Sequence, residues 1–169
     1  AARNVIADRY LLSLWSDAAA ILSARNEHDC YDRIAEACLN LWGNDATIYI
    51  GKVADEKKHF EMVAVAGHQS SHIKKELFTK HIPINKGIFG YLRKNEGPLL
   101  SYSTAKDERF RYHSMREDGE KEGSALAMKI SDPSDKNPIA FLSVEHEREN
   151  YFDTDDARYI IGLSRLGYE

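Results

Sequence analysis

The sequence predicts an α+β domain built on a largely antiparallel sheet. Apolar residues recur at helical intervals near both ends of the chain, whereas the middle holds short runs of β-branched and aromatic residues separated by turn-forming residues. Helices that flank a set of strands are typical of a layered α+β structure. The 169 residues suit one domain, 1–169, with an N-terminal helix over 1–24, a core over 25–152 and a C-terminal helix over 153–169.

The composition is that of a soluble globular protein. Apolar residues make up 43% of the chain and charged residues 30%, and no apolar run could span a membrane. The net charge of −4, with scattered Lys and Arg, argues against direct contact with nucleic acid. The only cysteines, Cys30 and Cys38, form neither a disulfide framework nor a metal-knuckle spacing, so we expect a cytoplasmic protein without membrane contact. Because the chain starts at Ala1 and stops at Glu169 within a predicted helix, we expect it to be an excised fragment of a longer protein.

The first predicted elements are two amphipathic helices. Apolar residues recur at helical spacing over residues 5–24. A second helix begins near Asp29 and continues until Gly43, a residue suited to end a helix. Cys30 and Cys38 lie on the apolar side of this second helix, so we expect them to pack in the core rather than react.

The central segment predicts strands. Residues 46–53 and 60–66 are rich in β-branched and aromatic residues and are joined by a charged turn, which predicts a hairpin. A later turn is expected at residues 132–137. It separates the last two of three further predicted strands, which are 98–101, 124–130 and 138–145.

The end of the chain predicts a strand followed by a helix. Glu145 and His146 are neighbours at the end of the last strand, so alternation directs their side chains to opposite faces of the sheet. The sequence leaves open which of the two faces a ligand. Asp153 and the acidic residues that follow it suit a helix N-terminus, where they accept backbone hydrogen bonds and complement the helix dipole.

Three short motifs lie in the central part of the chain: Gly87-Ile88-Phe89-Gly90-Tyr91-Leu92, Asn95-Glu96-Gly97-Pro98-Leu99-Leu100 and Ala105-Lys106-Asp107-Glu108-Arg109-Phe110. In order and spacing they resemble the central signature of the GAF family. Residues 124–130 and 139–145 resemble the last two strands of that family, although Lys129-Ile130 replaces the commoner Pro-Leu, and residues 152–156 resemble the start of its final helix. The resemblance covers residues 20–166 and depends on the joint order of motifs that are individually weak.

The resemblance implies a PAS-related antiparallel sheet of five or six strands, with the terminal helices on one face. A ligand pocket on the other face is implied to be roofed by residues 68–90 and 103–123. The implied function is that of a non-catalytic sensor in a signalling protein, such as a sensor histidine kinase of a two-component system, a cyclic-nucleotide enzyme or a transcription activator. It would bind an unidentified small molecule and relay its state through the terminal helices to an output domain of the parent chain. The candidate ligand-binding residues are Tyr91, Arg109, Phe110, Arg111, Tyr112, His113 and Glu145.

The local chemistry of these motifs also has a purely structural interpretation. Phe110 and Tyr112 could plug the core while Arg109, Arg111 and His113 are solvated. Asp107 is suited to accept backbone amide hydrogen bonds at the start of a helix.

Three better-known branches of the family can be compared with single residues. Phytochrome-like members attach a bilin to a Cys-His pair, and here Tyr112-His113 occupies that place, so we expect no covalent bilin and a colourless protein. Free methionine sulfoxide reductases need paired thiols, whereas Cys30 and Cys38 are eight residues apart on one helix. The cyclic-nucleotide signature is present only as fragments near residues 150–156. We therefore expect no enzymatic activity.

One spacing suits a metal. His68, His72 and Glu76 are four residues apart and would share one face of a continuous helix. Gly67 and the polar residues that follow indicate that a helix begins only after His68, so we expect a solvated face here rather than a metal site.

The assembly state is a separate prediction. Exposed apolar residues of the first helix, such as Leu11 and Leu14, favour a symmetric homodimer. The alternative function is a dimerisation or interaction module without a ligand, in which the pocket is filled by the bulky side chains of Phe89, Tyr91, Phe110 and Tyr112.

Overall fold

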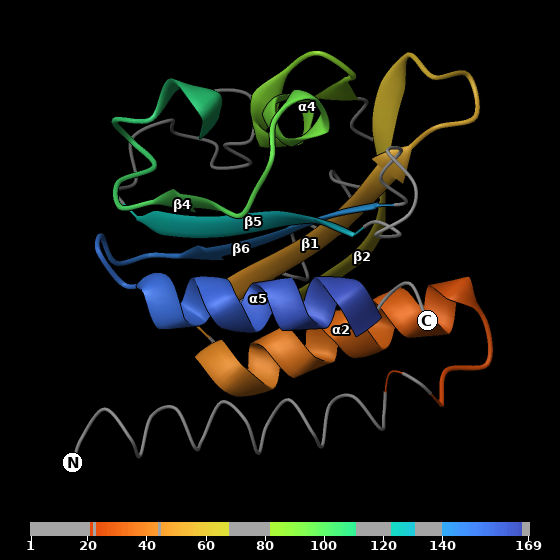
Figure 1. The fold of residues 1–169 in the computed structure, drawn as a ribbon, viewed down its shortest axis with the longest axis horizontal. Coiled ribbons are helices and arrows are strands. Elements are labelled where there is room, and N and C mark those ends of the chain that lie inside the picture. Colours follow the sequence, from red (N-terminus) through yellow and green to blue (C-terminus); the bar gives the residue numbers. More distant parts are fainter. Residues whose placement is uncertain are drawn as a thin grey trace.

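The computed structural model (Figure 1) describes most of the core of the chain. The described residues are 21, 23–43, 45–67, 82–110, 123–130 and 140–166, without the side chains of 164–166. Most of the helix predicted over 5–24, with Leu11 and Leu14, lies outside these residues, as does the turn predicted at 132–137. Within the described residues, each helix is too short or too polar to cross a lipid bilayer.

The described residues form a six-stranded sheet in the order β3-β2-β1-β6-β5-β4, and every neighbouring pair is antiparallel. Its strands are β1 (Ala46–Val53), β2 (His59–Gly67), β3 (Ile82–Pro83), β4 (Leu99–Ser101), β5 (Ser124–Ile130) and β6 (Ala140–His146). The predicted antiparallel sheet is therefore confirmed. β3 was not predicted from the sequence because two residues are too few to show an alternating pattern.

Helices cover both faces of this sheet. Figure 1 shows α2 (Glu27–Trp42) and α5 (Thr154–Leu166) side by side on one face, and α4 (Gly87–Lys94) on the other. The short 3₁₀ helix η1 (Glu108–Phe110) lies on the α4 side. We call the first side the helix face and the second the α4 face. The fold is the predicted α+β arrangement. α5 lies on the face expected for the terminal helices, with α2 beside it.

The helix boundaries follow from local capping. α2 begins at Glu27, two residues before the predicted start, because the Asn26 side chain accepts a hydrogen bond from the Asp29 amide at 2.9 Å. It ends at Gly43, as predicted, with a backbone φ of 83°. α5 begins after Asp153, whose Oδ1 accepts hydrogen bonds from the amides of Asp155 and Asp156 at 2.9 and 3.1 Å. The predicted capping role of Asp153 is confirmed.

Two hydrophobic clusters lie on opposite faces of the sheet. The cluster on the helix face is largely aliphatic and includes Ile34 of α2, Leu142 of β6 and Ile160 of α5, all fully buried. The cluster on the α4 face is centred on Phe60, Phe89 and Phe141, whose ring centroids lie 5.2 to 5.7 Å apart. Cys38 is buried in the first cluster and Cys30 packs against it, which confirms that both cysteines pack.

Candidate functional site

Strand β6 separates the two faces of the sheet residue by residue. Leu142 and Val144 lie in the cluster on the helix face, and Phe141 lies in the cluster on the α4 face. Because side chains alternate along a strand, Ser143 and Glu145 share the α4 face with Phe141. The sequence left open which of Glu145 and His146 faces a ligand. Glu145 lies on the α4 face, where a ligand was expected, and His146 lies on the helix face.

Strand register places small and polar residues around Ser143. Ser143 is paired with Tyr49 of β1 on one side and with Ala127 of β5 on the other. One step along, Glu145 is paired with Ala125, which is itself paired with Ser101 of β4. Directly paired residues share a face. We call this group the floor, and its members are Tyr49, Ser101, Ala125, Ala127, Ser143 and Glu145.

The floor differs from the aromatic end of the same face. Phe60, Phe89 and Phe141 pack ring against ring at one end. At the other end, Ala125 and Ala127 carry only methyl groups and Ser143 a single hydroxyl, yet all three are fully buried. Segments above the sheet therefore cover the floor, and Phe110 and Leu92 belong to the same buried cluster.

Ser143 is the most unusual polar group of the floor. Its exposed fraction is 0%, and within the described part of the chain its Oγ has no hydrogen-bond partner. A buried hydroxyl left without a hydrogen bond costs about 1–3 kcal/mol, so such groups are uncommon inside proteins. A polar ligand atom above the floor would supply the missing bond. The half-buried Glu145 carboxylate adds a hydrogen-bond acceptor on the same side.

The candidates Tyr91 and Arg109 are held together by Asp107. The Arg109 side chain donates from Nε and Nη2 to the two carboxylate oxygens of Asp107 at 2.7 and 2.6 Å. The Arg109 guanidinium also lies 5.0 Å from the ring centroid of Tyr91. We call Tyr91, Asp107 and Arg109 the clamp. The clamp links α4 to η1, and in it the Arg109 charge is paired with a carboxylate of the same chain.

Asp107 is strongly held in its charged form. Burial would by itself raise the pKa of Asp107, but hydrogen bonds from Arg109 and Ser101 outweigh it and hold the pKa below its ordinary value. The same hydrogen bonds from Arg109 to Asp107 raise the pKa of Arg109. The Asp107 carboxylate also accepts from the Arg109 amide at 3.1 Å, so its predicted role at the start of a helical turn is confirmed.

The remaining candidates have different positions. Phe110 is 3% exposed and lies in the cluster above the floor, as the plugging interpretation requires. No group of three or more His, Cys, Asp or Glu within the described ranges could hold a metal ion. The other candidates lie outside the described residues, and they are Arg111, Tyr112, His113, His68, His72 and Glu76.

Sequence reasoning missed Ser143, Tyr49 and Ser101. Each sits in a strand with ordinary strand composition, so no local pattern sets it apart. The alternation of Ala125 and Ala127 along β5 was a signal that part of one face of this strand carries small side chains. Only the pairing of β5 with β6 shows that Ser143 lies beside Ala127.

Comparisons with known proteins identify the fold through structure alone. No protein-family model matches the sequence, and no curated protein matches it. A GAF domain of a phosphoenolpyruvate-protein phosphotransferase from Coxiella burnetii is similar in structure, with a TM-score of 0.79 and 16% identity over 96% of this chain and 93% of that one. The corresponding GAF domain from Acinetobacter gives a TM-score of 0.77 and 16% identity over 93% of this chain and 89% of that one.

An enzyme shares the same fold. The free methionine-R-sulfoxide reductase of Neisseria meningitidis, solved in complex with its substrate, has a TM-score of 0.73 and 15% identity over 95% of this chain and 87% of that one. Both kinds of neighbour cover nearly the whole chain. Identities this low establish a shared architecture and leave the activity to the residues of the site.

Proposed function

Because this chain has the GAF fold, we propose that it is a non-catalytic sensory domain that binds a small polar molecule against the floor and relays its presence through α5. The observation that carries the proposal is the Ser143 hydroxyl, buried and without a partner among the described residues. Ligand pockets combine apolar surface with a few convergent polar groups. The floor combines two alanines with four residues that carry a polar group.

The positions of the cysteines support a non-catalytic role. Cys30 and Cys38 are the only cysteines in the chain, and both belong to α2 on the helix face. The sheet therefore separates each thiol from the floor. Burial is the main cause that raises the pKa of the Cys30 thiol, which lowers its reactive thiolate fraction. A thiol-based sulfoxide reduction at the floor, or a thioether to a bilin there, would need a thiol on the α4 face.

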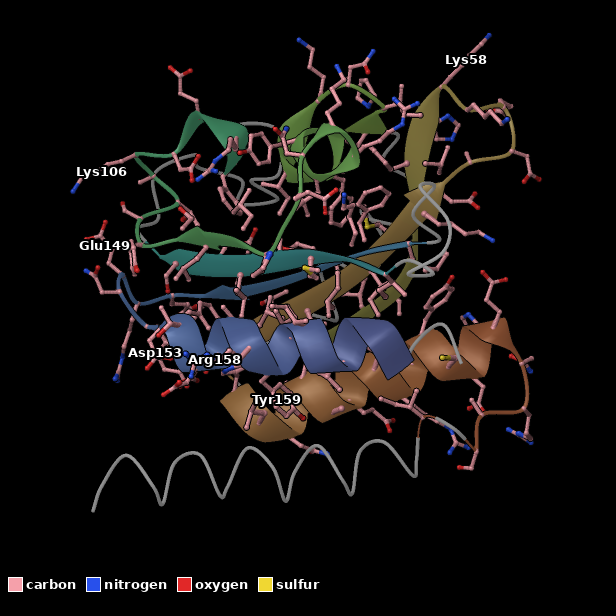
Figure 2. The ribbon with its side chains drawn as sticks, viewed as in Figure 1. Lys58, Lys106, Glu149, Asp153, Arg158 and Tyr159 are labelled. Atoms are coloured by element: carbon pink, nitrogen blue, oxygen red, sulfur yellow. The ribbon has the colours of Figure 1, made fainter. Side chains whose placement is uncertain are left out.

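A path for the signal starts at β6. Ser143 and Glu145 lie on this strand, and residues 147–153, which we call the connection, lead from it directly into α5. The connection also touches the loop before η1: the Asn150 amide donates to the Tyr102 carbonyl at 2.9 Å, and Lys106 Nζ lies 3.9 Å from Glu149 Oε1. Figure 2 shows Lys106 and Glu149 at the same end of the molecule as Asp153. A ligand that shifts β6 or this loop would bias the start of α5.

One observation favours the alternative function. Three Phe rings fill the aromatic end of the α4 face, and Phe110 lies above the floor, so the domain could serve as a dimerisation or interaction module without a ligand. The two functions differ in one measurable quantity, which is a bound small molecule.

Native mass spectrometry beside a denatured sample tests the proposal. We expect a non-covalent mass, near one per chain, that disappears on denaturation. Once the molecule is identified, Ser143→Ala should weaken its binding about threefold to tenfold, which is the contribution of one hydrogen bond. Ser23→Ala is the matched control, because Ser23 is exposed and its hydroxyl accepts a hydrogen bond from Arg33 of α2, on the opposite side of the sheet from the floor. A chain that carries no small molecule and shows no thermal shift with a metabolite panel would favour the dimerisation module.

A further inference from the structure

His146, at the end of β6, is a residue to which the proposed function assigns no role. Its side chain lies on the helix face at the end of β6 and is 4% exposed. The Tyr151 ring stacks on the imidazole with centroids 3.6 Å apart and an interplanar angle of 1°. The Arg148 amide donates a hydrogen bond to His146 Nδ1 at 3.0 Å.

The Arg148 hydrogen bond determines the protonation state of the ring. Nδ1 can accept from an N–H only through its lone pair, so the imidazole is neutral and carries its proton on Nε2. Protonation of Nδ1 would place an N–H opposite the Arg148 N–H and replace an attraction with a repulsion. It would also place a positive charge in a buried position.

The groups around His146 shift its pKa in opposite directions. Burial is the largest effect and lowers the pKa of His146 below its ordinary value, and Arg148 lowers it further. Asp45, next to β1, and Glu147 oppose this shift. The face of the Tyr151 ring also favours a cation.

Asp156 of α5 is another acid near the connection, and both oxygens of its carboxylate accept hydrogen bonds. Its Oδ1 accepts from Trp42 Nε1 at 2.8 Å, and its Oδ2 accepts from the Asp153 amide at 2.8 Å. Burial and the lost hydrogen bond therefore outweigh the acids, and the neutral ring is the stable form at neutral pH.

His146 and Tyr151 join three elements that meet at this point. The Tyr151 hydroxyl donates to the Trp42 carbonyl at the end of α2, at 3.2 Å. Ser124 of β5 donates to the Arg148 carbonyl at 2.6 Å and accepts from the Tyr151 amide at 3.2 Å. These bonds hold the connection against β5, α2 and the start of α5.

We propose that His146 is a proton-sensitive latch, which holds the connection in place when its ring is neutral and releases it when the ring is protonated. Release would loosen the connection and its bond from the Tyr151 hydroxyl to the end of α2. It would thereby weaken the attachment of the N-terminus of α5, which stays bonded to α2 through Trp42 Nε1 and Asp156. The latch acts from the helix face and needs no ligand on the floor.

The pH range follows from the sign of the shift. A histidine whose pKa is lower in the folded than in the unfolded chain binds fewer protons when folded. Its contribution to stability is complete above the ordinary histidine value of 6.5 and is lost as the pH falls below that value. The release is therefore expected on the acid side of pH 6.5.

The test follows the protonation of the His146 ring and the amide exchange of the connection in the same chain, between about pH 7.5 and about pH 5. Ring ¹⁵N shifts should show the Nε2–H form of His146 and a titration midpoint below 6.5. Exchange of the Arg148 amide, corrected for its intrinsic pH dependence, should rise about fivefold as the ring is protonated. His146→Asn keeps an acceptor close to the position of Nδ1 and should remove this rise.

His28→Asn is the matched control, since His28 is exposed and its Nε2 lies 3.5 Å from Asp32 Oδ2. This variant should retain the full pH response. Two results would overturn the latch: a ring that titrates at or above 6.5, or Arg148 exchange that stays constant while the ring is protonated. If His146→Asn fails to fold, the ring titration and the exchange of the unaltered chain still decide the question. Ser143→Ala should leave the pH response unchanged, which separates this proposal from the proposed function.

Discussion

The two faces of the sheet are built on different principles. The helix face carries an aliphatic layer under α2 and α5, and its buried polar groups are engaged, as Trp42 Nε1 is with Asp156 at 2.8 Å. The α4 face combines three packed Phe rings with the floor, which includes two alanines and the Ser143 hydroxyl, a group without a partner among the described residues. A face whose buried polar groups are all hydrogen-bonded supports stability. A face with a buried polar group that lacks a hydrogen bond leaves an interaction for a ligand.

The largest expected effect tests the helix face. Leu142→Ala should lower the free energy of unfolding by about 2–5 kcal/mol, because Leu142 is fully buried between β6 and the helices and its removal leaves a cavity. Urea unfolding followed by circular dichroism measures it. A loss below about 1 kcal/mol would mean that the helix face is loosely packed, and the contrast between the faces would fail.

The next effect tests the aromatic end of the α4 face. A Cβ on Gly51 would lie 2.7 Å from a ring carbon of Phe89, next to the register shift between Ile50 and Gly51. Gly51→Ala should therefore cost about 1–3 kcal/mol through overpacking. Combining it with Phe89→Leu should recover part of the loss in a double-mutant cycle, since the smaller side chain makes room. Strictly additive losses would show that the two residues do not touch.

A smaller effect is expected for the clamp. Arg109→Met removes the partner of Asp107 and should cost about 1 kcal/mol, a value reduced for the partial exposure of Arg109. Because the pKa of Asp107 is held below its ordinary value of 3.8, the stability from this pair is present above that pH and is lost as the pH falls below it. Acid unfolding curves of the two proteins should converge at low pH. A constant difference down to the lowest pH would contradict the assignment.

The smallest effect is expected at the floor. Ser143→Ala should change the free energy of unfolding of the ligand-free chain by less than about 1 kcal/mol, or increase it, because the removed hydroxyl has no partner among the described residues. Leu142→Ala, one residue away on the opposite face, provides the contrast in the same assay. A large loss at Ser143 would show that its hydroxyl is engaged by another part of the chain.

Capping and periodicity made the helices and strands predictable. The cap of α5 at Asp153, the end of α2 at Gly43 and the individual strands of the longer hairpins are readable from residues a few positions apart. The start of α2 was misplaced by two residues because Asn26 was not recognised as its cap. The order of the motifs around Gly87 and Asp107 predicted the GAF fold from the sequence alone.

The sequence by itself determined most of the local elements, their order and the face alternation of the longer strands, whereas β3 was too short to show a pattern. The tertiary structure alone decided that Ser143 lies between Tyr49 and Ala127. It also decided that the Arg109 guanidinium is hydrogen-bonded to Asp107 and lies over the Tyr91 ring, and that the His146 ring stacks on Tyr151. The physical reason is that periodicity and capping act over a few residues, whereas strand register pairs segments that lie as far apart as β1 and β6. A shift of one residue in that register would exchange the faces of Ser143 and Leu142.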